Sequence, residues 1–168
     1  MKRSLMALIS SIALAAAAPA LAAGGGGDGG GGGGGAGGSE ASVQDPDFQA
    51  GMAAVRRQDW QQVVARMGAY TQRDPSNADA WNELGHAHRK LGQIDPALSA
   101  YGKALRINPK HKGAHEYLGE AYLQIGDLAR AEQELKALDA ICFLPCEEYT
   151  DLKAQISAYK AKQAKPGS

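Results

Sequence analysis

Two cysteines near the end of the chain are the residues best suited to chemistry. Cys142 and Cys146 lie in ICFLPCEEY with three residues between them, which differs from the C-x-x-C of thiol oxidoreductases and the C-x-x-C-H of c-type haem attachment. In a secreted protein such a pair most often forms a structural disulfide. We predict that disulfide, which would contribute about 2 kcal/mol or less and fix the angle of the following helix. A redox-active pair and a metal site are the alternatives.

The four histidines are the other candidate metal ligands. His111 and His115 are four residues apart, but His111 falls in a predicted turn, and His115 occupies a position predicted to pack between helices. His88 is also expected to point inward, and His86 is the fourth histidine. Because the spacing supplies no third and fourth ligand, we predict no metal and no cofactor.

No arrangement for catalysis stands out elsewhere. The serines lack a neighbouring motif, the carboxylates are spread over predicted helix surfaces, and the glycine tract does not precede a helix as a phosphate-binding loop does. The 168 residues carry a formal net charge of zero with 21% charged residues, unlike a strongly basic nucleic-acid binder. We therefore predict a protein that is not an enzyme and does not bind nucleic acid.

The start of the chain is typical of a secretory signal peptide. Lys2 and Arg3 precede an apolar run from Leu5 to Ala18, followed by APALAA. The run is shorter than the roughly 20 residues of a membrane-spanning helix. We expect cleavage after Ala22 and a secreted, periplasmic protein without a membrane span, and an uncleaved anchor is the alternative.

The next segment is rich in glycine. Thirteen of the 22 glycines lie between Gly24 and Gly38, and such a segment has no side chains with which to bury apolar surface. We expect a disordered, flexible linker with a reach of about 20 Å.

The rest of the chain repeats at one fixed spacing. Pro75 and Pro109 are 34 residues apart, and Gly51, Gly85 and Gly119 keep the same spacing. Further series at the same spacing are Ala50, Leu84 and Leu118, then Val63, Ala97 and Ala131, then Met67, Tyr101 and Leu135, and then Tyr70, Ala104 and Leu138. A fixed period of this length is typical of a stack of helical repeats.

Each repeat contains start and stop signals for two helices. In the second repeat, the predicted signals are Asn77 as a cap, Gly92 as a left-handed stop, Asp95 as the next cap with Pro96 after it, and Asn108-Pro109 as the end. The matching pairs elsewhere are Asp45-Pro46, Gln58-Asp59, Asp74-Pro75 and Gly126-Asp127. Gly85 and Gly119 are expected where the two helices of a repeat cross, opposite Ala97 and Ala131.

This pattern resembles the tetratricopeptide repeat. The second repeat carries nearly the full family signature, namely Trp81, Leu84, Gly85, Ala97, Tyr101, Ala104 and Pro109. His88 departs from it where the family has Tyr, and the first repeat is degenerate, with Asp47 and Ala54 at the positions of Trp and Tyr. The resemblance covers about residues 44–143 and implies an all-α solenoid of three helix-turn-helix repeats.

One more helix is predicted after the repeats. It carries apolar residues at helical spacing, Tyr149, Leu152, Ile156 and Tyr159, and is expected to cap the last repeat. The predicted organisation is a signal peptide (1–22), a linker (23–43), repeats at 44–75, 78–111 and 112–145, a capping helix (146–163) and a loose tail (164–168).

The resemblance also implies a concave groove lined by the first helix of each repeat. The predicted groove residues are Phe48, Met52, Val55, Asn82, His86, Arg89, Lys90, Glu116 and Glu120, with Asp45, Asp79, Gly113 and Leu123 at the same kinds of position. An extended or helical segment could place an apolar side chain at Phe48 and Met52 and an acidic group near His86 and Arg89. The alternative is an ordinary solvated helix face.

Some family members clamp a partner's terminal carboxylate with Lys and Arg, but the matching positions here are Gly113, Glu116, Tyr117 and Glu120. We predict a scaffold or adaptor for a protein or peptide partner, with its oligomeric state open. The alternatives are a redox- or cofactor-linked accessory protein using Cys142 and Cys146, and a structural envelope component tethered by its glycine segment.

Overall fold

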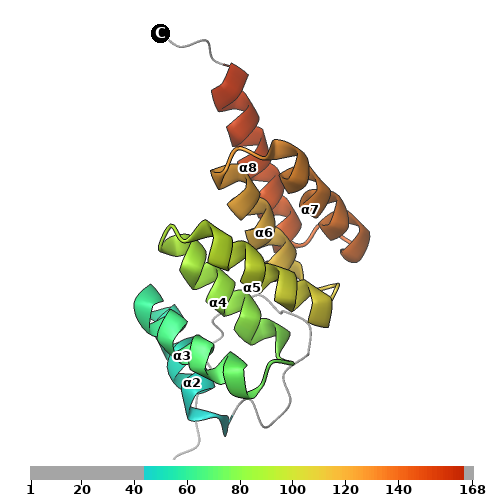
Figure 1. Cartoon of the computed structure of the whole chain (residues 1–168). Helices are drawn as coiled ribbons and strands as arrows, with labels where there is room; N and C mark the ends of the chain where they lie inside the picture. The colour runs from blue at the N-terminus through green and yellow to red at the C-terminus, as the bar shows by residue number, and fades with distance from the viewer. Residues whose placement is uncertain (1–43, 165–168) are drawn as a thin grey trace, which may run out of the picture. The chain divides into compact units, whose positions relative to one another are not determined.

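The computed structural model describes residues 44–164, which form seven helices (Figure 1). The helices are α2 (Pro46–Arg56), α3 (Trp60–Arg73), α4 (Ala78–Lys90), α5 (Ile94–Ile107), α6 (Lys112–Gln124), α7 (Leu128–Ile141) and α8 (Glu147–Ala164). The predicted signal peptide and glycine linker, residues 1–43, lie outside the described residues, as do residues 165–168.

The helices pair as three hairpins, α2 with α3, α4 with α5, and α6 with α7. Each hairpin packs against the next in chain order, and α8 packs against both helices of the last hairpin (Figure 1). The described residues are therefore an all-α solenoid of three helix-turn-helix units with a capping helix, as the sequence predicts.

Most of the predicted helix signals act as expected. The Asn77 side chain accepts a hydrogen bond from the Ala80 backbone N–H at 3.0 Å, and Asp45, Asp59 and Asp127 cap the starts of α2, α3 and α7. Gly92 ends its helix with φ +74°, a conformation that glycine adopts without steric strain.

The predicted cap at Asp95 is wrong, because α5 begins at Ile94, two residues before the predicted first helical residue Pro96. The Gln93 N–H donates to the His88 carbonyl at 2.8 Å, so the turn after Gly92 leads directly into the new helix. Gln93 holds the cap position, which corresponds in the repeat to Asp59 and Asp127, but its side chain makes no capping bond. Asp95 instead lies in the first turn, where its charge favours the helix dipole.

Close helix crossings explain the repeated glycines. A Cβ on Gly85 would lie 2.7 Å from the ring of Tyr101, in the second helix of the same hairpin. A Cβ on Gly119 would lie 2.6 Å from Leu152 of α8, so at this position the capping helix makes the nearest approach. Leu135 occupies the position of Tyr101 in the last hairpin and is shorter, which leaves the space for the capping helix to fill.

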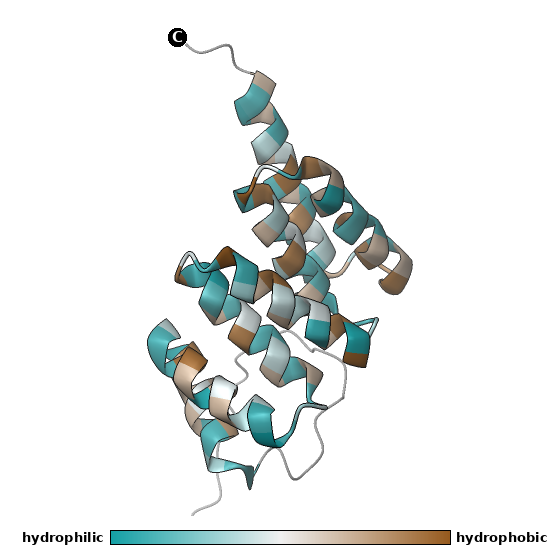
Figure 2. Cartoon of the chain, viewed as in Figure 1, coloured by the Kyte–Doolittle hydropathy of each residue, from teal (hydrophilic) through white to brown (hydrophobic). Residues whose placement is uncertain are grey.

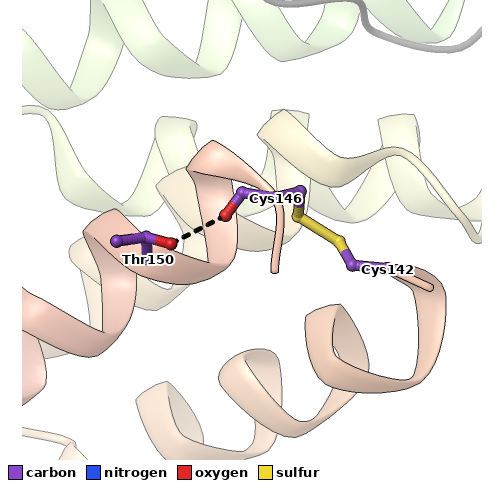
Figure 3. The surroundings of a disulfide bond; sticks show 3 residues. All are labelled: Cys142, Cys146 and Thr150. Atoms are coloured by element: carbon purple, nitrogen blue, oxygen red, sulfur yellow. Dashed lines mark hydrogen bonds between the residues drawn. A yellow bond between two sulfur atoms is a disulfide. The ribbon is translucent and has the colours of Figure 1, made fainter. Parts of the chain in front are cut away.

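The cysteines join the last hairpin to the capping helix. Cys142 and Cys146 form a disulfide with their Cα atoms 5.9 Å apart, the pairing that the sequence predicts. The Thr150 hydroxyl, in the first turn of α8, donates a hydrogen bond to the Cys146 carbonyl at 3.0 Å (Figure 3). This bond links the disulfide to the capping helix. Within the closed loop, Phe143 is 99% exposed and Leu144 is 72% exposed.

Each described helix carries both hydrophilic and hydrophobic residues. In Figure 2, no helix is hydrophobic along its whole length. Within residues 44–164, none of the helices is both long enough and apolar enough to cross a membrane.

Candidate functional site

The first helices of the three hairpins and the start of α8 surround a cavity of about 360 Å³. Its lining residues are Phe48 and Met52 from α2, Asp79, Asn82 and Glu83 from α4, His111 before α6, Gly113, Glu116 and Tyr117 from α6, and Glu147, Glu148 and Asp151 from α8. We call this cavity the groove. Positions exactly one repeat apart recur along its wall, as in Phe48, Asn82 and Glu116, so the repeat itself brings these side chains together.

The groove has an apolar end and an acidic remainder. Phe48 and Met52 supply the apolar end, and both pack against the core of the first hairpin. The acidic part has six acidic side chains, Asp79, Glu83, Glu116, Glu147, Glu148 and Asp151, and none of the described lining residues is Lys or Arg. A ligand here would therefore meet apolar surface and negative charge together.

Four of the nine predicted groove residues line the groove, namely Phe48, Met52, Asn82 and Glu116. The other five, Val55, His86, Arg89, Lys90 and Glu120, do not. The predicted exposure is wrong for Asn82 and Arg89, which are 4% and 6% exposed. Packing of α4 against α6 covers both side chains, and the sequence pattern alone does not include that contact.

Arg89 is neutralised by an ion pair within the protein. Its guanidinium pairs with the Glu120 carboxylate, and their side chains are only 5% and 11% exposed. The guanidinium also lies 5.5 Å from the centre of the Tyr117 ring. The predicted role of Arg89 as an exposed cation of the groove is therefore wrong, because Glu120 balances its charge where α4 meets α6.

His86 is also part of a junction between hairpins. Its ring lies 5.1 Å from the ring of Trp60 and 4.3 Å from the ring of Tyr117. Burial, together with the positive charges of Arg89 and Lys90, lowers the pKa of His86 to about 3. His86 is therefore neutral near pH 7, and the structure gives no support to docking of an acidic group at His86 and Arg89.

The carboxylates of the groove are held in an unfavourable environment for negative charge. Burial is the main cause that raises the pKa of Glu83 to about 7, with Asp79 adding repulsion. Burial also raises the pKa of Glu116 to about 8, and repulsion from Glu120, Asp151 and Glu148 adds to it. A positively charged ligand would relieve this repulsion.

His111 has a role that the sequence did not reveal. Its Nδ1 accepts a hydrogen bond from the Ala114 N–H at 3.1 Å and caps α6, so its Nε2 carries the proton and donates to Asp79 at 2.9 Å. The bond holds Asp79, at the start of α4, against the start of α6. His111 does lie in the inter-repeat turn, but its capping function was missed because His is not a common cap residue.

His115 packs between helices, as predicted, and is 9% exposed. Its Nδ1 lies 2.6 Å from Glu134 and its Nε2 lies 3.0 Å from the Pro109 carbonyl. Burial lowers the pKa of His115, but these hydrogen bonds outweigh the burial, so the pKa is raised. Among residues 44–164, no group of three or more His, Cys, Asp or Glu side chains is arranged to hold a metal ion.

Two further groups of lining residues were missed. Glu83 and Tyr117 occupy equivalent positions in successive repeats. Each directly follows a predicted groove residue, Asn82 or Glu116, so adding this next position of the repeat to the prediction would have found both. The second group, Glu147, Glu148 and Asp151, lies in the first turns of α8. Their place in the groove depends on how α8 docks, which the sequence does not state.

Family models match the middle of this fold. Residues 78–111 and residues 100–133 each match a tetratricopeptide repeat model. The two matches together cover residues 78–133, and this part of the chain is similar to tetratricopeptide repeats. The first match coincides with the second predicted repeat, whereas the first hairpin and α8 lie outside both matches.

Two curated proteins are similar to part of the chain. The mouse Superkiller complex protein 3 is 36% identical over 95 residues, which is 53% of this chain and 6% of that protein. The Xenopus laevis tetratricopeptide repeat protein 37 is 32% identical over 91 residues, 51% of this chain and 6% of that protein. The chain thus spans only a small fraction of the length of these relatives.

Several solved structures share the fold. PcrH, in complex with the chaperone-binding region of PopD, has a TM-score of 0.64 at 21% identity and covers 74% of this chain and 96% of its own. The Yersinia enterocolitica chaperone SycD with a YopD peptide has a TM-score of 0.62 at 20% identity, covering 74% and 97%. The first repeat domain of Spaghetti (RPAP3) with an HSP90 peptide has a TM-score of 0.60 at 18% identity, covering 67% and 89%.

Proposed function

We propose that this protein is a non-enzymatic adaptor of the cell envelope that binds a segment of a partner protein in the groove. The observation that carries the proposal is a cavity of about 360 Å³ whose wall combines Phe48 and Met52 with polar and charged side chains. Binding sites usually combine apolar surface with a few placed polar groups in this way. The relatives PcrH, SycD and RPAP3, whose structures contain peptides, support the same type of function.

The groove can be blocked without changing its charge. Gly113 lines the groove, and a Cβ there would make only ordinary contacts, the nearest at 3.5 Å to Asn82. A Gly113→Leu variant should therefore fold and fill part of the cavity. Gly68→Leu is a matched control, because a Cβ on Gly68 would meet nothing within 4 Å and Gly68 does not line the groove.

The test is selection of binders from a random displayed peptide library against the full chain. We expect enriched peptides that bind the wild type and Gly68→Leu and bind Gly113→Leu at least about tenfold more weakly, since steric blocking removes the contacts of a whole side chain. Failure to enrich any peptide, or equal binding to all three proteins, would reject the groove.

The envelope location is a separate part of the proposal and rests on Lys2, Arg3, the apolar run and APALAA. Mass spectrometry of the protein isolated from its own host tests it. We expect a mature chain that begins at Ala23, in the periplasmic fraction. An intact N-terminus in the cytoplasmic fraction would overturn this part of the proposal and leave the groove unaffected.

The alternative redox role of Cys142 and Cys146 has its own discriminating measurement. A structural disulfide should resist reduction by glutathione buffers and leave peptide binding independent of redox poise. Reversible reduction at physiological poise, accompanied by a change in peptide affinity, would favour the redox-linked alternative over a simple adaptor.

A further inference from the structure

We propose that the groove selects a basic segment, one that carries several Lys or Arg residues together with an apolar side chain. This inference rests on the proposed function and names the chemistry of its ligand. It is the reverse of the acidic ligand that the sequence predicts, and the reversal comes from the tertiary structure.

The first argument is the distribution of charge around the groove. Six acidic side chains from α4, α6 and α8 line it, and within residues 44–164 no Lys or Arg is among the lining residues. Arg89, the arginine that the sequence pattern assigns to the groove, is paired with Glu120 and buried. Negative charge in the groove is therefore not balanced by neighbouring cations of the lining, and a cationic ligand would be attracted.

The second argument is an unsatisfied hydrogen-bond acceptor in the wall. Asn82 lines the groove and is 4% exposed. Its Nδ2 donates to Glu83 at 3.2 Å, whereas its Oδ1 has no hydrogen-bond partner among the described residues. Buried polar atoms are rarely left unpaired, so this oxygen indicates a donor such as an ammonium, a guanidinium or a peptide N–H.

The arrangement of the carboxylates favours a peptide over a single metal ion. They are distributed along helices α4, α6 and α8, and no group of three or more of them among residues 44–164 converges on one point. Several separate cations on one chain match such a distribution better than one ion does. Phe48 and Met52 at the apolar end would receive an aliphatic or aromatic side chain of the same segment.

The experiment measures affinity by fluorescence anisotropy, with the full chain and short labelled peptides. Every peptide has Phe and Leu at fixed positions, and the variable positions are all lysine, all glutamine or all glutamate. We expect the lysine peptide to bind at least about tenfold more tightly than the other two, and its affinity to fall as ionic strength rises. Gly113→Leu should weaken its binding.

A pair of charge reversals tests the position of the site. Glu147 and Asp151 are exposed, line the groove and lie one helical turn apart. We expect Glu147→Lys with Asp151→Lys to weaken lysine-peptide binding at least about tenfold. The control, Asp95→Lys with Asp139→Lys, also reverses two exposed carboxylates, one of them in a first helical turn, and should bind as the wild type does.

The outcomes separate this inference from the function on which it rests. Glutamine or glutamate peptides that bind best, and that Gly113→Leu still blocks, would overturn the basic ligand and keep the peptide-binding groove. Equal binding of the lysine peptide to the groove double variant and to the control double variant would also overturn the basic ligand, because the peptide would then bind outside the groove. No binding by any peptide, including those enriched from the random library, would reject both proposals.

Discussion

Both junctions between neighbouring hairpins contain an apolar cluster, but the second junction also contains buried polar pairs. At the first, α3 and α4 contribute to one apolar cluster, whose buried members are Ala54, Val63, Met67, Tyr70, Ala80, Leu84, Ala87 and Ala100. At the second, α4 meets α6 partly through polar pairs, Arg89 with Glu120 and Asp79 with His111. The ring of His86 lies against Tyr117 at the same junction.

This difference shows how one repeat can serve two purposes. An apolar junction gains stability from burial of non-polar surface. A buried ion pair contributes little net stability, but removal of one partner leaves a charge buried without compensation. The second junction therefore holds the hairpins in a defined arrangement and, by neutralising Arg89, leaves the groove above it acidic.

The largest expected effect is loss of the arginine at the polar junction. Arg89→Met should lower the free energy of unfolding by about 3–5 kcal/mol, because Glu120 loses its ion-pair partner and keeps only the hydrogen bond from Gln155. Urea unfolding followed by circular dichroism measures the change. Arg89→Met combined with Glu120→Leu should recover most of the loss, since an apolar pair of similar size can replace a buried ion pair.

Arg73 provides the matched control for that prediction. It pairs with Asp45 and Asp47, but its side chain is 50% exposed. Arg73→Met should leave the unfolding midpoint almost unchanged, because exposed ion pairs contribute little. Equal losses from the two arginine variants would show that burial does not distinguish the pairs and would contradict the comparison.

A smaller loss is expected at the apolar junction. Leu84 is 7% exposed and belongs to its cluster, so Leu84→Ala should lower the free energy of unfolding by about 2–3 kcal/mol. The loss should change little with salt concentration, unlike that of a charged variant. A strong salt dependence of the Leu84→Ala effect, measured in the same urea titrations, would argue against an apolar junction.

The acidic groove should make stability depend on pH. The folded-state pKa of Glu116 is raised to about 8 from the ordinary 4.5, so the folded protein holds more protons than the unfolded chain between these values. Stability contributed by Glu116 therefore falls as pH rises through that window. Glu116→Gln should become progressively more stable than the wild type between about pH 5 and pH 8. A constant difference in thermal midpoint across that range would contradict the raised pKa.

The smallest effect is expected in the turn of the first hairpin. Gln58 has φ +56°, whereas the equivalent residues, Gly92 and Gly126, have φ +74° and +81°. A side chain is strained in this conformation and glycine is not. Gln58→Gly should raise the free energy of unfolding by about 0.5–1 kcal/mol, and Gly92→Gln should lower it. A loss of stability in Gln58→Gly would mean that the Gln58 side chain makes a compensating contact.

Much of the fold follows from the sequence because its signals are local and recur in every repeat. Asn77, Gly92 and Asp127 specify helix ends through bonds and backbone angles within a few residues of themselves. The disulfide of Cys142 and Cys146 is equally local. The predicted start at Asp95 shows the limit of such local signals. An Asp side chain can cap a helix, but the backbone turn at Gly92 leads into α5 before Asp95 is reached.

The character of the groove was decided only by the tertiary structure. Whether Arg89 faces solvent or Glu120 depends on packing between α4 and α6, which belong to different repeats, and electrostatic pairing of this kind has no periodic signature. Whether Glu147, Glu148 and Asp151 line the groove depends on the docking of α8, in which Leu152 fills the space over Gly119. The sequence by itself determined the repeat, the helices and the residues near the groove. Long-range packing determined which charges remain available to a ligand, because it decides which are buried with a partner and which are left facing the cavity.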